Sequence, residues 1–365
     1  MEDLKKLSYT TIDDVKDMIN IEDEDKLIKV TERHPMRITD YYFNLINKDD
    51  MNDPIRKLSV PSCSELDMSG EYDTSGESSN TKFSGLQHKY STTVLVLTTN
   101  ECFMYCRHCF RKRMVGYSQE EINMRLDMTV DYIKTHENVN NVLLTGGDSF
   151  CLSNNIIKEY VNRLAEIDHL DFIRFGTRSP VVFPQRIYND KILLSILKEA
   201  GKKKRIYVVT HFDHPNEITP ESEKAVKALL DVGVIVQNQA VLLKGVNDNP
   251  DVLAALLNGL VKIGVNPYYV FQCRPVKSVK ASFELPLIES LRIIDETKKQ
   301  LNGLSKRFKF IMSHVKGKIE IVGECDDKLI FKFHQSKCED DFNKIFIKDI
   351  NTGAKWLDAD LNYID

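Results

Sequence analysis

Short apolar runs and longer amphipathic stretches alternate through the middle of the chain. Six runs are rich in Val, Ile, Leu and aromatic side chains, as buried strands are: residues 92–99, 141–145, 172–177, 205–211, 234–239 and 267–272. Between them, stretches such as 154–167, 189–201, 221–233 and 251–264 repeat apolar residues at the spacing of amphipathic helices. The alternation predicts βα units and a parallel sheet that is buried on both faces.

Six strands are two fewer than a complete (β/α)8 barrel contains. We therefore expect an α/β fold, a partial (β/α)6 TIM-like open barrel, although a doubly wound sheet fits the same pattern. In both architectures, ligands bind at the carboxyl ends of the strands.

The flanking segments have different compositions. Residues 1–66 are predicted to be helical, with amphipathic candidates at 11–19 and 38–46. Residues 67–85 are rich in Ser, Gly and Asp, which predicts a flexible, exposed linker before the core at 86–305. Residues 306–365 contain strand-like runs and are expected to cap the sheet.

The charge balance argues against several classes of partner. The chain has 50 Lys plus Arg against 54 Asp plus Glu, a net charge of -4, which gives no support to a nucleic-acid or anionic-membrane partner. No apolar run approaches the ~20 residues of a membrane span, and the polar N-terminus is unlike a targeting peptide. We expect a cytoplasmic protein whose eight cysteines are ligands or core residues rather than disulfides.

Polar residues follow each predicted strand where that strand ends. In chain order they are the cysteines at 102–109, Gly146–Asp148, residues 176–180, residues 210–217, Asn238 with Gln239, and residues 272–274. Six sets of polar groups at one edge of a sheet favour a binding or catalytic site over a purely structural scaffold.

The first set contains three cysteines and no fourth one nearby. Cys102, Cys106 and Cys109 form a Cys-x3-Cys-x2-Cys pattern. Structural zinc sites use four protein ligands, so zinc would need a distant fourth ligand and stays an alternative. An iron–sulfur cluster held by three thiolates leaves one iron open. S-Adenosylmethionine can chelate that iron and, on reduction, yield a 5′-deoxyadenosyl radical.

The three-cysteine pattern followed by Gly-Gly-Asp after the next strand is typical of radical S-adenosylmethionine enzymes. Gly146 and Gly147 would let the backbone approach the methionyl end of the cofactor closely, and Asp148 can accept from its ammonium group. His108 stands where an aromatic ring usually meets the adenine. We therefore predict a [4Fe-4S] cluster and S-adenosylmethionine as cofactors.

Longer matches make the resemblance more specific. "ERHPMRITDYYFNLI", "GLQHKY", "CFMYCRHCFRKR", "LLTGGDSF", "TRSPVVFPQRI", "THFDHPNEIT", "NQAVLLKGVND" and "PYYVFQC" occur in order between Glu32 and Lys318. They resemble the lysine 2,3-aminomutase family. The resemblance implies a partly open barrel, the cluster, S-adenosylmethionine and, in many members, pyridoxal 5′-phosphate. It also places Arg178 and His211 with the cofactors.

The resemblance implies a lysine that binds pyridoxal phosphate covalently, late in the chain after a glycine. Lys318 follows Gly317, and Lys316 is the alternative. Lys89 falls where the family places a phosphate-binding cation, and Gln239 matches a polar pocket residue.

Three departures from the family pattern concern the cofactors. The glycine run before the lysine is absent, and Thr93 replaces a second phosphate-binding arginine. Both departures weaken the case for pyridoxal phosphate. Cys325 and Cys338 do not reproduce the zinc-binding cysteines of longer members, so we expect no zinc.

Substrate recognition is predicted from two arginines. Arg111 matches the residue that pairs with the α-carboxylate of the amino acid, a contact to which a guanidinium is suited. Arg274 stands where lysine-using members carry an aspartate for the distal ammonium. A cation there would repel lysine and attract a carboxylate, unless Arg274 turns outward or pairs with an acid such as Glu284.

The predicted function is that of an isomerase, a radical enzyme that moves an amino group from Cα to Cβ of an amino acid. The expected partners are a small amino acid substrate and an external low-potential electron donor, and homo-oligomerisation is left open. One alternative is a radical enzyme without pyridoxal phosphate that acts on another carboxylate substrate. Another is a non-enzymatic iron–sulfur protein.

Overall fold

A computed structural model describes residues 8–116, 119–123 and 125–364. Its main sheet has 12 strands in the order β14-β13-β12-β11-β10-β9-β8-β7-β6-β5-β4-β3. The six predicted strands are β5 (Thr93–Thr99), β6 (Asn141–Gly146), β7 (Phe172–Gly176), β8 (Arg205–Thr210), β9 (Ile235–Leu242) and β10 (Asn266–Gln272). Consecutive members of this set pair in parallel.

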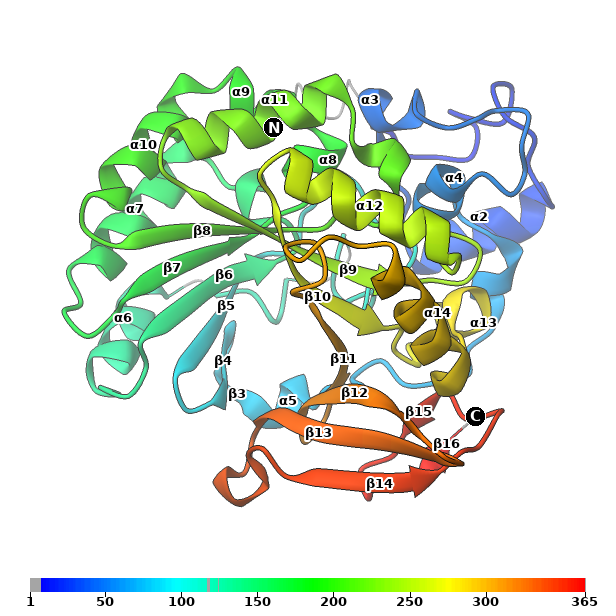
Figure 1. Cartoon of the computed structure of the whole chain (residues 1–365). Helices are drawn as coiled ribbons and strands as arrows, with labels where there is room; N and C mark the ends of the chain where they lie inside the picture. Colours follow the sequence, from blue (N-terminus) through cyan, green and yellow to red (C-terminus); the bar gives the residue numbers. More distant parts are fainter. Residues whose placement is uncertain (1–7, 117–118, 124, 365) are drawn as a thin grey trace.

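The strand order decides between the two predicted architectures. A doubly wound sheet reverses direction at a switch point, whereas here each strand lies beside the next one in the sequence. Figure 1 shows the strands curving into an incomplete barrel. The predicted partial (β/α)6 barrel is confirmed.

Helices cover the outer face of the barrel (Figure 1). They are α6 (Leu126–Lys134), α7 (Asn154–Ala165), α10 (Lys191–Gly201), α11 (Pro220–Asp231), α12 (Pro250–Lys262) and α14 (Leu287–Lys299). The side chains of Ser153, Asp190 and Thr219 accept from backbone N–H groups in the first turns of three of these helices. Each helix buries its apolar face, such as Leu193 and Leu197 of α10.

The N-terminal segment is only partly helical. It contains β1 (Ser8–Tyr9), α2 (Glu24–Arg33), β2 (Ile38–Thr39), α3 (Asp40–Phe43), α4 (Pro54–Ser59) and η1 (Cys63–Leu66). The helix predicted at 11–19 is instead a series of turns. Asp14 accepts from the backbone N–H groups of Thr10 and Thr11, which fixes a turn, while Val15 is still buried.

The segment predicted as a flexible, exposed linker is built into the fold. It forms α5 (Glu77–Asn80) and β3 (Thr81–Phe83), and β3 pairs with β4 (Leu86–Tyr90) at one edge of the main sheet. Glu77 and Asn80 are buried. The polar composition misled the prediction because Glu77 pairs with Arg111 and Arg113, which lie outside the segment.

The C-terminal segment begins inside the parallel sheet. β11 (Lys309–His314) pairs in parallel with β10, so the expected boundary at 305 and 306 does not interrupt the sheet. β12 (Gly317–Cys325), β13 (Lys328–Ser336) and β14 (Ile345–Asp349) continue it with antiparallel pairings. The remaining elements are α8 (Ser179–Val182), α9 (Gln185–Tyr188), α13 (Lys280–Phe283), β15 (Trp356–Leu357), β16 (Tyr363–Ile364) and the short turns η2 (Ser149–Cys151), η3 (Pro215–Glu217) and η4 (Glu339–Asp341).

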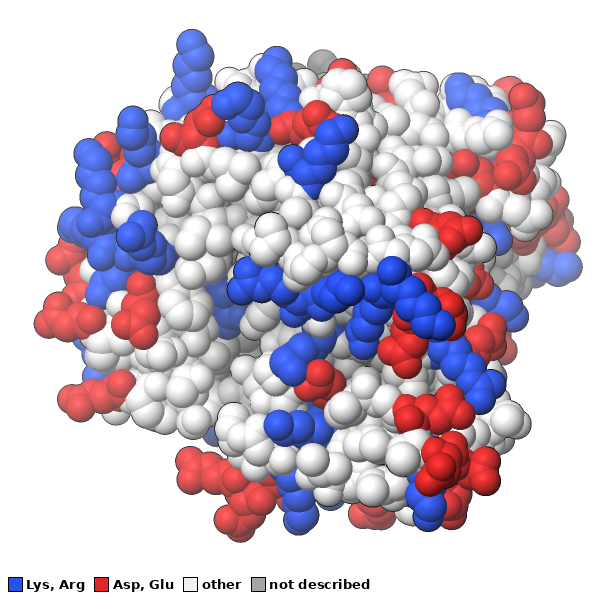
Figure 2. Space-filling model, viewed as in Figure 1, with Lys and Arg blue, Asp and Glu red and all other residues white. Residues whose placement is uncertain are grey.

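The surface carries both signs of charge. Figure 2 shows Lys and Arg gathered in a band across the middle of this face, with acidic side chains interspersed elsewhere. Among the described residues, none of the helices combines the length and the apolar character that crossing a membrane requires.

Candidate active site

One cavity brings the predicted site residues together. It has a volume of about 370 Å³ and is bounded by the loops at the carboxyl ends of the parallel strands and by the C-terminal sheet. All the predicted residues line it: Lys89, Cys102, Cys106, His108, Cys109, Arg111, Gly146, Gly147, Asp148, Arg178, His211, Gln239, Arg274 and Lys318. Positions far apart in the sequence therefore form one site.

The cysteine loop follows β5 and places its three thiols at the cavity. Burial raises the pKa of all three, to about 11 for Cys109. Among the described residues, His108, His211 and Asp213 form a group whose ligand atoms all lie within 4.8 Å of one another. The three thiols do not form such a group. Zn–S bonds of about 2.3 Å would put thiolates about 3.8 Å apart, so the set is wider than a zinc ion requires.

The N-terminal segment binds the cysteine loop through a buried carboxylate. Glu65 of η1 is buried and accepts from Arg107 through both oxygens, at 2.9 and 2.6 Å, and from Lys112 at 2.5 Å. Burial alone would raise the pKa of Glu65, but these two cations lower it to about 2. The carboxylate therefore stays ionised and ties η1 to both sides of the loop.

Gly146 and Gly147 form a narrow contact between β6 and the cysteine loop. Gly146 has φ of 116°, and a Cβ on Gly147 would lie 2.3 Å from the carbonyl oxygen of Glu101. Only a residue without a side chain fits this approach. The two glycines therefore bring the Gly-Gly-Asp turn against the loop that carries the thiols.

Asp148 is buried and already has several protein donors. Its oxygens accept from the backbone N–H groups of Phe150 and Arg178, both at 2.9 Å, and from the Thr177 hydroxyl at 2.6 Å. Ser179 adds longer contacts to both oxygens. In this arrangement Asp148 holds the loops after β6 and β7 together.

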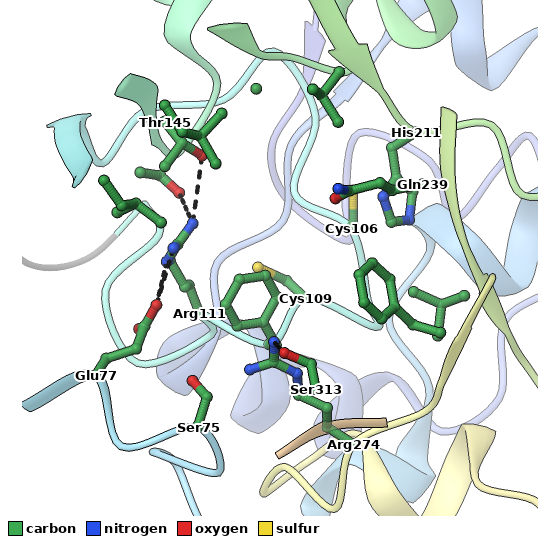
Figure 3. A pocket seen from close by; sticks show the side chains of 18 of the residues that line it. Ser75, Glu77, Cys106, Cys109, Arg111, Thr145, His211, Gln239, Arg274 and Ser313 are labelled. Atoms are coloured by element: carbon green, nitrogen blue, oxygen red, sulfur yellow. Dashed lines mark hydrogen bonds and ion pairs between the residues drawn. The ribbon is translucent and has the colours of Figure 1, made fainter. Parts of the chain in front are cut away.

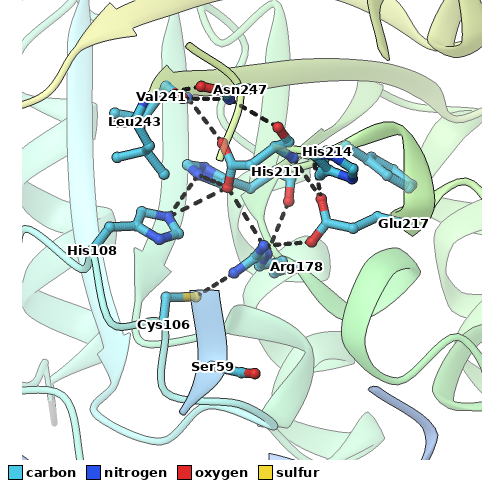
Figure 4. A network of polar contacts seen from close by, with 12 residues as sticks. Ser59, Cys106, His108, Arg178, His211, His214, Glu217, Val241, Leu243 and Asn247 are labelled. Carbon is cyan, nitrogen blue, oxygen red and sulfur yellow. Dashed lines mark hydrogen bonds and ion pairs between the residues drawn. The ribbon is translucent and has the colours of Figure 1, made fainter. Parts of the chain in front are cut away.

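A network of buried polar groups joins Arg178 to the cysteine loop (Figure 4). Its guanidinium donates to Cys106 Sγ at 2.8 Å, to Glu217 at 2.7 Å and to Asp213 at 3.4 Å. Arg178 also opposes the effect of burial on the pKa of Cys106. A guanidinium beside a ligand sulfur favours the thiolate form that metal binding requires.

His108 and His211 lie beside Asp213 in the same network. The two imidazole Nε2 atoms are 3.2 Å apart, and Asp213 Oδ2 lies 2.9 Å from that of His211. Burial lowers the pKa of His108 to about 3, so this ring is neutral, and its Nδ1 is buried without a partner. The three ligand atoms are close enough for a cation, but the Arg178 guanidinium on Asp213 opposes one.

Arg111 is held by a residue that the sequence did not indicate (Figure 3). Its Nε and Nη2 donate to Glu77 Oε1 at 3.0 and 2.9 Å, and Arg113 donates to the other oxygen at 2.7 Å. Nη1 points toward Thr145 and the carbonyl of Gly146, at 3.4 and 3.5 Å. Glu77 thus fixes the Arg111 guanidinium at the wall of the cavity.

Two lysines reach the cavity from opposite ends of the main sheet. Lys318 Nζ donates to Gln335 Oε1 at 2.6 Å and lies 4.7 Å from the centre of the Tyr90 ring. Lys89 Nζ donates to the carbonyl oxygens of His314 and Ser75 at 2.6 and 3.1 Å. Burial is the main cause that lowers the pKa of each lysine to about 7. Lys316 is not among the lining residues.

Arg274 faces the cavity rather than Glu284. It donates to the hydroxyl of Ser313 at 2.7 Å and stacks 4.2 Å from the centre of the Phe110 ring. Burial lowers the pKa of Arg274 to about 10, so it is still a cation at neutral pH. The alternative pairing with Glu284 is not found, and the Glu284 carboxylate has no hydrogen-bond partner.

Several lining residues were missed by sequence reasoning: Glu77, Arg174, Ser313 and Gln335. Arg174 had a signal, because it is a charged residue inside the apolar run 172–177. Glu77 and Gln335 had none, because each lies in a polar or alternating stretch typical of exposed positions.

Comparison of the sequence with known proteins agrees with this geometry. The family model described as Radical SAM superfamily matches residues 96–257, which hold the cysteine loop and the Gly-Gly-Asp turn. The fold and the site therefore define a radical S-adenosylmethionine enzyme.

Relatives with similar sequences narrow the class. A protein of Aquifex aeolicus (strain VF5) named "Putative L-lysine 2,3-aminomutase" is 40% identical over 97% of this chain and 95% of its own length. L-lysine 2,3-aminomutase of Clostridium subterminale is 39% identical over 80% of this chain and 70% of that protein. Glutamate 2,3-aminomutase of Clostridioides difficile (strain 630) is 35% identical over 81% and 70%. The chain belongs to the lysine 2,3-aminomutase family of isomerases.

Membership implies a [4Fe-4S] cluster and S-adenosylmethionine, and the residues present fit both. Cys102, Cys106 and Cys109 are the donor set that a cluster with one open iron needs. The Gly146–Gly147 backbone is free of side chains beside them, and His108 Nδ1 is an unpaired polar atom at the same site.

Proposed function

We propose that this chain moves an amino group from Cα to Cβ of an amino acid, with pyridoxal phosphate bound at Lys318. The observation that carries the proposal is that the three thiols, Lys318 and Arg111 line one cavity. When bound, the cluster and S-adenosylmethionine supply a radical that removes a substrate hydrogen, and pyridoxal phosphate supplies a conjugated ring that carries the nitrogen.

The environment of Lys318 suits covalent attachment to an aldehyde. An amine is nucleophilic only when neutral, and a pKa of about 7 leaves a large neutral fraction at physiological pH. Gln335 accepts the amine N–H and fixes its direction, while Tyr90 offers a ring face beside it. These contacts fit a lysine that binds pyridoxal phosphate.

The arginines in the cavity provide two places for carboxylates. Glu77 and Arg113 orient Arg111, and the Arg111 Nη1 points to the cavity wall at Thr145. We assign Arg111 to the α-carboxylate of the substrate. Arg274 and the Ser313 hydroxyl form a second donor pair. We assign that pair to the substrate side chain, which favours an acidic amino acid with glutamate as the simplest candidate.

The remaining predicted residues hold the cluster ligands and the cofactors in position. Arg178 donates to Cys106 and orients the ligand sulfur, while Asp148 holds the loops around the methionyl end of S-adenosylmethionine. We place His108 and His211 beside the adenine, and Lys89 and Gln239 beside pyridoxal phosphate. We also propose an external low-potential electron donor and a cytoplasmic location.

The test of the proposal is anaerobic purification and reconstitution of the full chain with iron and sulfide. We expect broad iron–sulfur absorption and an iron content close to that of one [4Fe-4S] cluster per chain. We also expect cleavage of S-adenosylmethionine under reducing conditions. Each of Cys102→Ala, Cys106→Ala and Cys109→Ala should lose both, whereas Cys338→Ala, at an exposed cysteine, should keep both. Stoichiometric zinc without iron would contradict the proposal.

Pyridoxal phosphate is tested separately. Borohydride reduction and peptide mapping should place a pyridoxyl group on Lys318. An active cluster with no labelled lysine would instead favour the radical enzyme that works without pyridoxal phosphate.

A further inference from the structure

Arg174 is a cation inside the barrel to which the proposed function assigns no role. It lies on β7 and lines the same cavity as Lys318 and Tyr268. Its guanidinium donates from Nη2 to Asn141 Oδ1, and its Nε is buried without a partner. A buried N–H without an acceptor is unfavourable, so this donor is suited to a ligand.

The charge of Arg174 also has no counter-ion in the protein. Among the described residues, no carboxylate lies within ion-pair distance of Arg174, whereas Arg111 has Glu77 and Arg178 has Glu217. Arg174 is half-buried, and a charge shielded from water without a partner is unfavourable. A bound anion would supply both the counter-charge and the acceptor for Nε.

Arg174 and Lys318 line the same cavity. Among nearby charges, Arg174 contributes most to the lowered pKa of Lys318, ahead of Lys89 and Arg274. An anionic group on a molecule attached to Lys318 would therefore fall within reach of this guanidinium.

A hydrogen-bonded chain connects Arg174 to Thr93 on β5. The Thr93 hydroxyl and the Asn141 amide are 3.0 Å apart, and the other end of that amide accepts from Arg174. The three residues come from the adjacent strands β5, β6 and β7. Thr93 carries no charge, and Arg174 supplies the cation to this wall of the cavity from two strands away.

We propose that Arg174 binds the phosphate of pyridoxal phosphate, with its free Nε and one Nη as donors and Asn141 as the residue that orients it. The inference rests on the proposed function, because it requires pyridoxal phosphate at Lys318. A guanidinium matches phosphate oxygens through two parallel N–H donors. The phosphate dianion neutralises a charge that the protein leaves unpaired.

The test compares pyridoxal phosphate with pyridoxal, which has the aldehyde but no phosphate. The anaerobically purified full chain is titrated with each aldehyde, and binding is followed by absorbance and by borohydride labelling of Lys318. Arg174→Gln should weaken pyridoxal phosphate about ten- to a hundredfold and change pyridoxal less than about threefold. Arg174→Lys, which keeps the charge, should recover part of the preference for the phosphate.

Two controls make the outcomes distinct. Arg292→Gln removes an exposed arginine on α14, outside the cavity, and it should leave both affinities unchanged. Iron content and circular dichroism report on folding of each variant. If Arg174→Gln and Arg174→Lys bind both aldehydes as wild type does, or lose both equally, the inference is wrong while the proposed function stands. If wild type labels with neither aldehyde, the proposed pyridoxal phosphate site fails, and this assignment fails with it.

Discussion

Lys318 shows how one residue acquires reactivity from its surroundings. A free lysine has a pKa near 10.4, so little of it is neutral at pH 7. Burial, reinforced by the charge of Arg174, lowers the pKa of Lys318 to about 7. The neutral amine is the form that attacks an aldehyde, so the position of this pKa sets the pH range of attachment.

The rate of pyridoxal phosphate attachment should therefore rise between pH 6 and 8 and level off above it. With a pKa of about 7, the neutral fraction increases about tenfold over this range. An ordinary lysine would gain about a hundredfold and keep rising toward pH 10. The measurement is the initial rate of borohydride-trapped label on the Lys318 peptide at each pH.

Lys316→Arg is the matched control, since it changes the neighbouring lysine and should keep the profile. A rate that climbs without a plateau up to pH 10 would show that the amine is not perturbed. Loss of label in Lys316→Arg with retention in Lys318→Arg would assign attachment to Lys316.

Residue chemistry was partly readable from the sequence. Cys102, Cys106 and Cys109 were found because their spacing is a local pattern, and Arg274 because it departs from the family at a defined position. Glu77 was not found, because its burial follows from Arg111 and Arg113, more than thirty residues away. A pairing between residues so far apart becomes apparent only in the complete fold.

At the scale of elements, the cysteine loop depends on a buried ion triad. Glu65 neutralises one of two cations, Arg107 and Lys112, at a place where all three side chains are at most 6% exposed. Removing one partner of a buried pair leaves an uncompensated charge and commonly costs about 3–5 kcal/mol. The loop that carries the thiols therefore depends on η1 from the N-terminal segment.

Glu65→Gln should lower the free energy of unfolding by about 3–5 kcal/mol and release the cluster more readily. The measurements are anaerobic urea unfolding and iron retained after chelator challenge. Glu101→Gln is the comparison, because its ion pair with Arg37 lies on the same loop but is 20% and 35% exposed on the two sides. Such exposed pairs contribute about 1 kcal/mol or less.

Equal effects of the two substitutions would contradict the role given to Glu65. A loss of stability without easier loss of iron would show that the triad stabilises the fold but does not hold the loop.

Elements with a strong apolar pattern were predicted well. The six parallel strands match the predicted runs closely, because a strand buried on both faces needs a continuous apolar run. β11 was not predicted, although it extends the barrel past the expected boundary at residue 305. The segment containing α5 was predicted as an exposed linker because composition does not show that Glu77 is buried between two arginines.

For the whole molecule, the cavity collects basic side chains from distant elements. Lys89 comes from β4, Arg174 from β7 and Lys318 from β12, and Arg274 follows β10. Within the described part of the chain, none of these four has a carboxylate within ion-pair distance, as Arg111 does. The fold therefore creates a positive cavity within a chain whose net charge is -4. Such a cavity favours ligands that carry phosphate and carboxylate groups.

The choice of amino acid should follow from this charge. If Arg274 faces the substrate side chain, the ammonium of lysine would lie near a like charge, which costs roughly 4 kcal/mol at about 4 Å and an effective dielectric near 20. That corresponds to about three orders of magnitude in affinity. Glutamate would instead accept from Arg274 and from Ser313, which already lie 2.7 Å apart.

Turnover of glutamate, glutamine, lysine and arginine by the reconstituted enzyme tests this prediction. Wild type should prefer glutamate, and Arg274→Asp should shift the preference toward lysine mainly through KM, because the substitution reverses the distal charge and leaves Arg111 in place. Arg292→Asp reverses an exposed arginine on α14 and should leave the ranking unchanged. Efficient use of lysine by wild type, unaltered in Arg274→Asp, would show that Arg274 does not select the substrate.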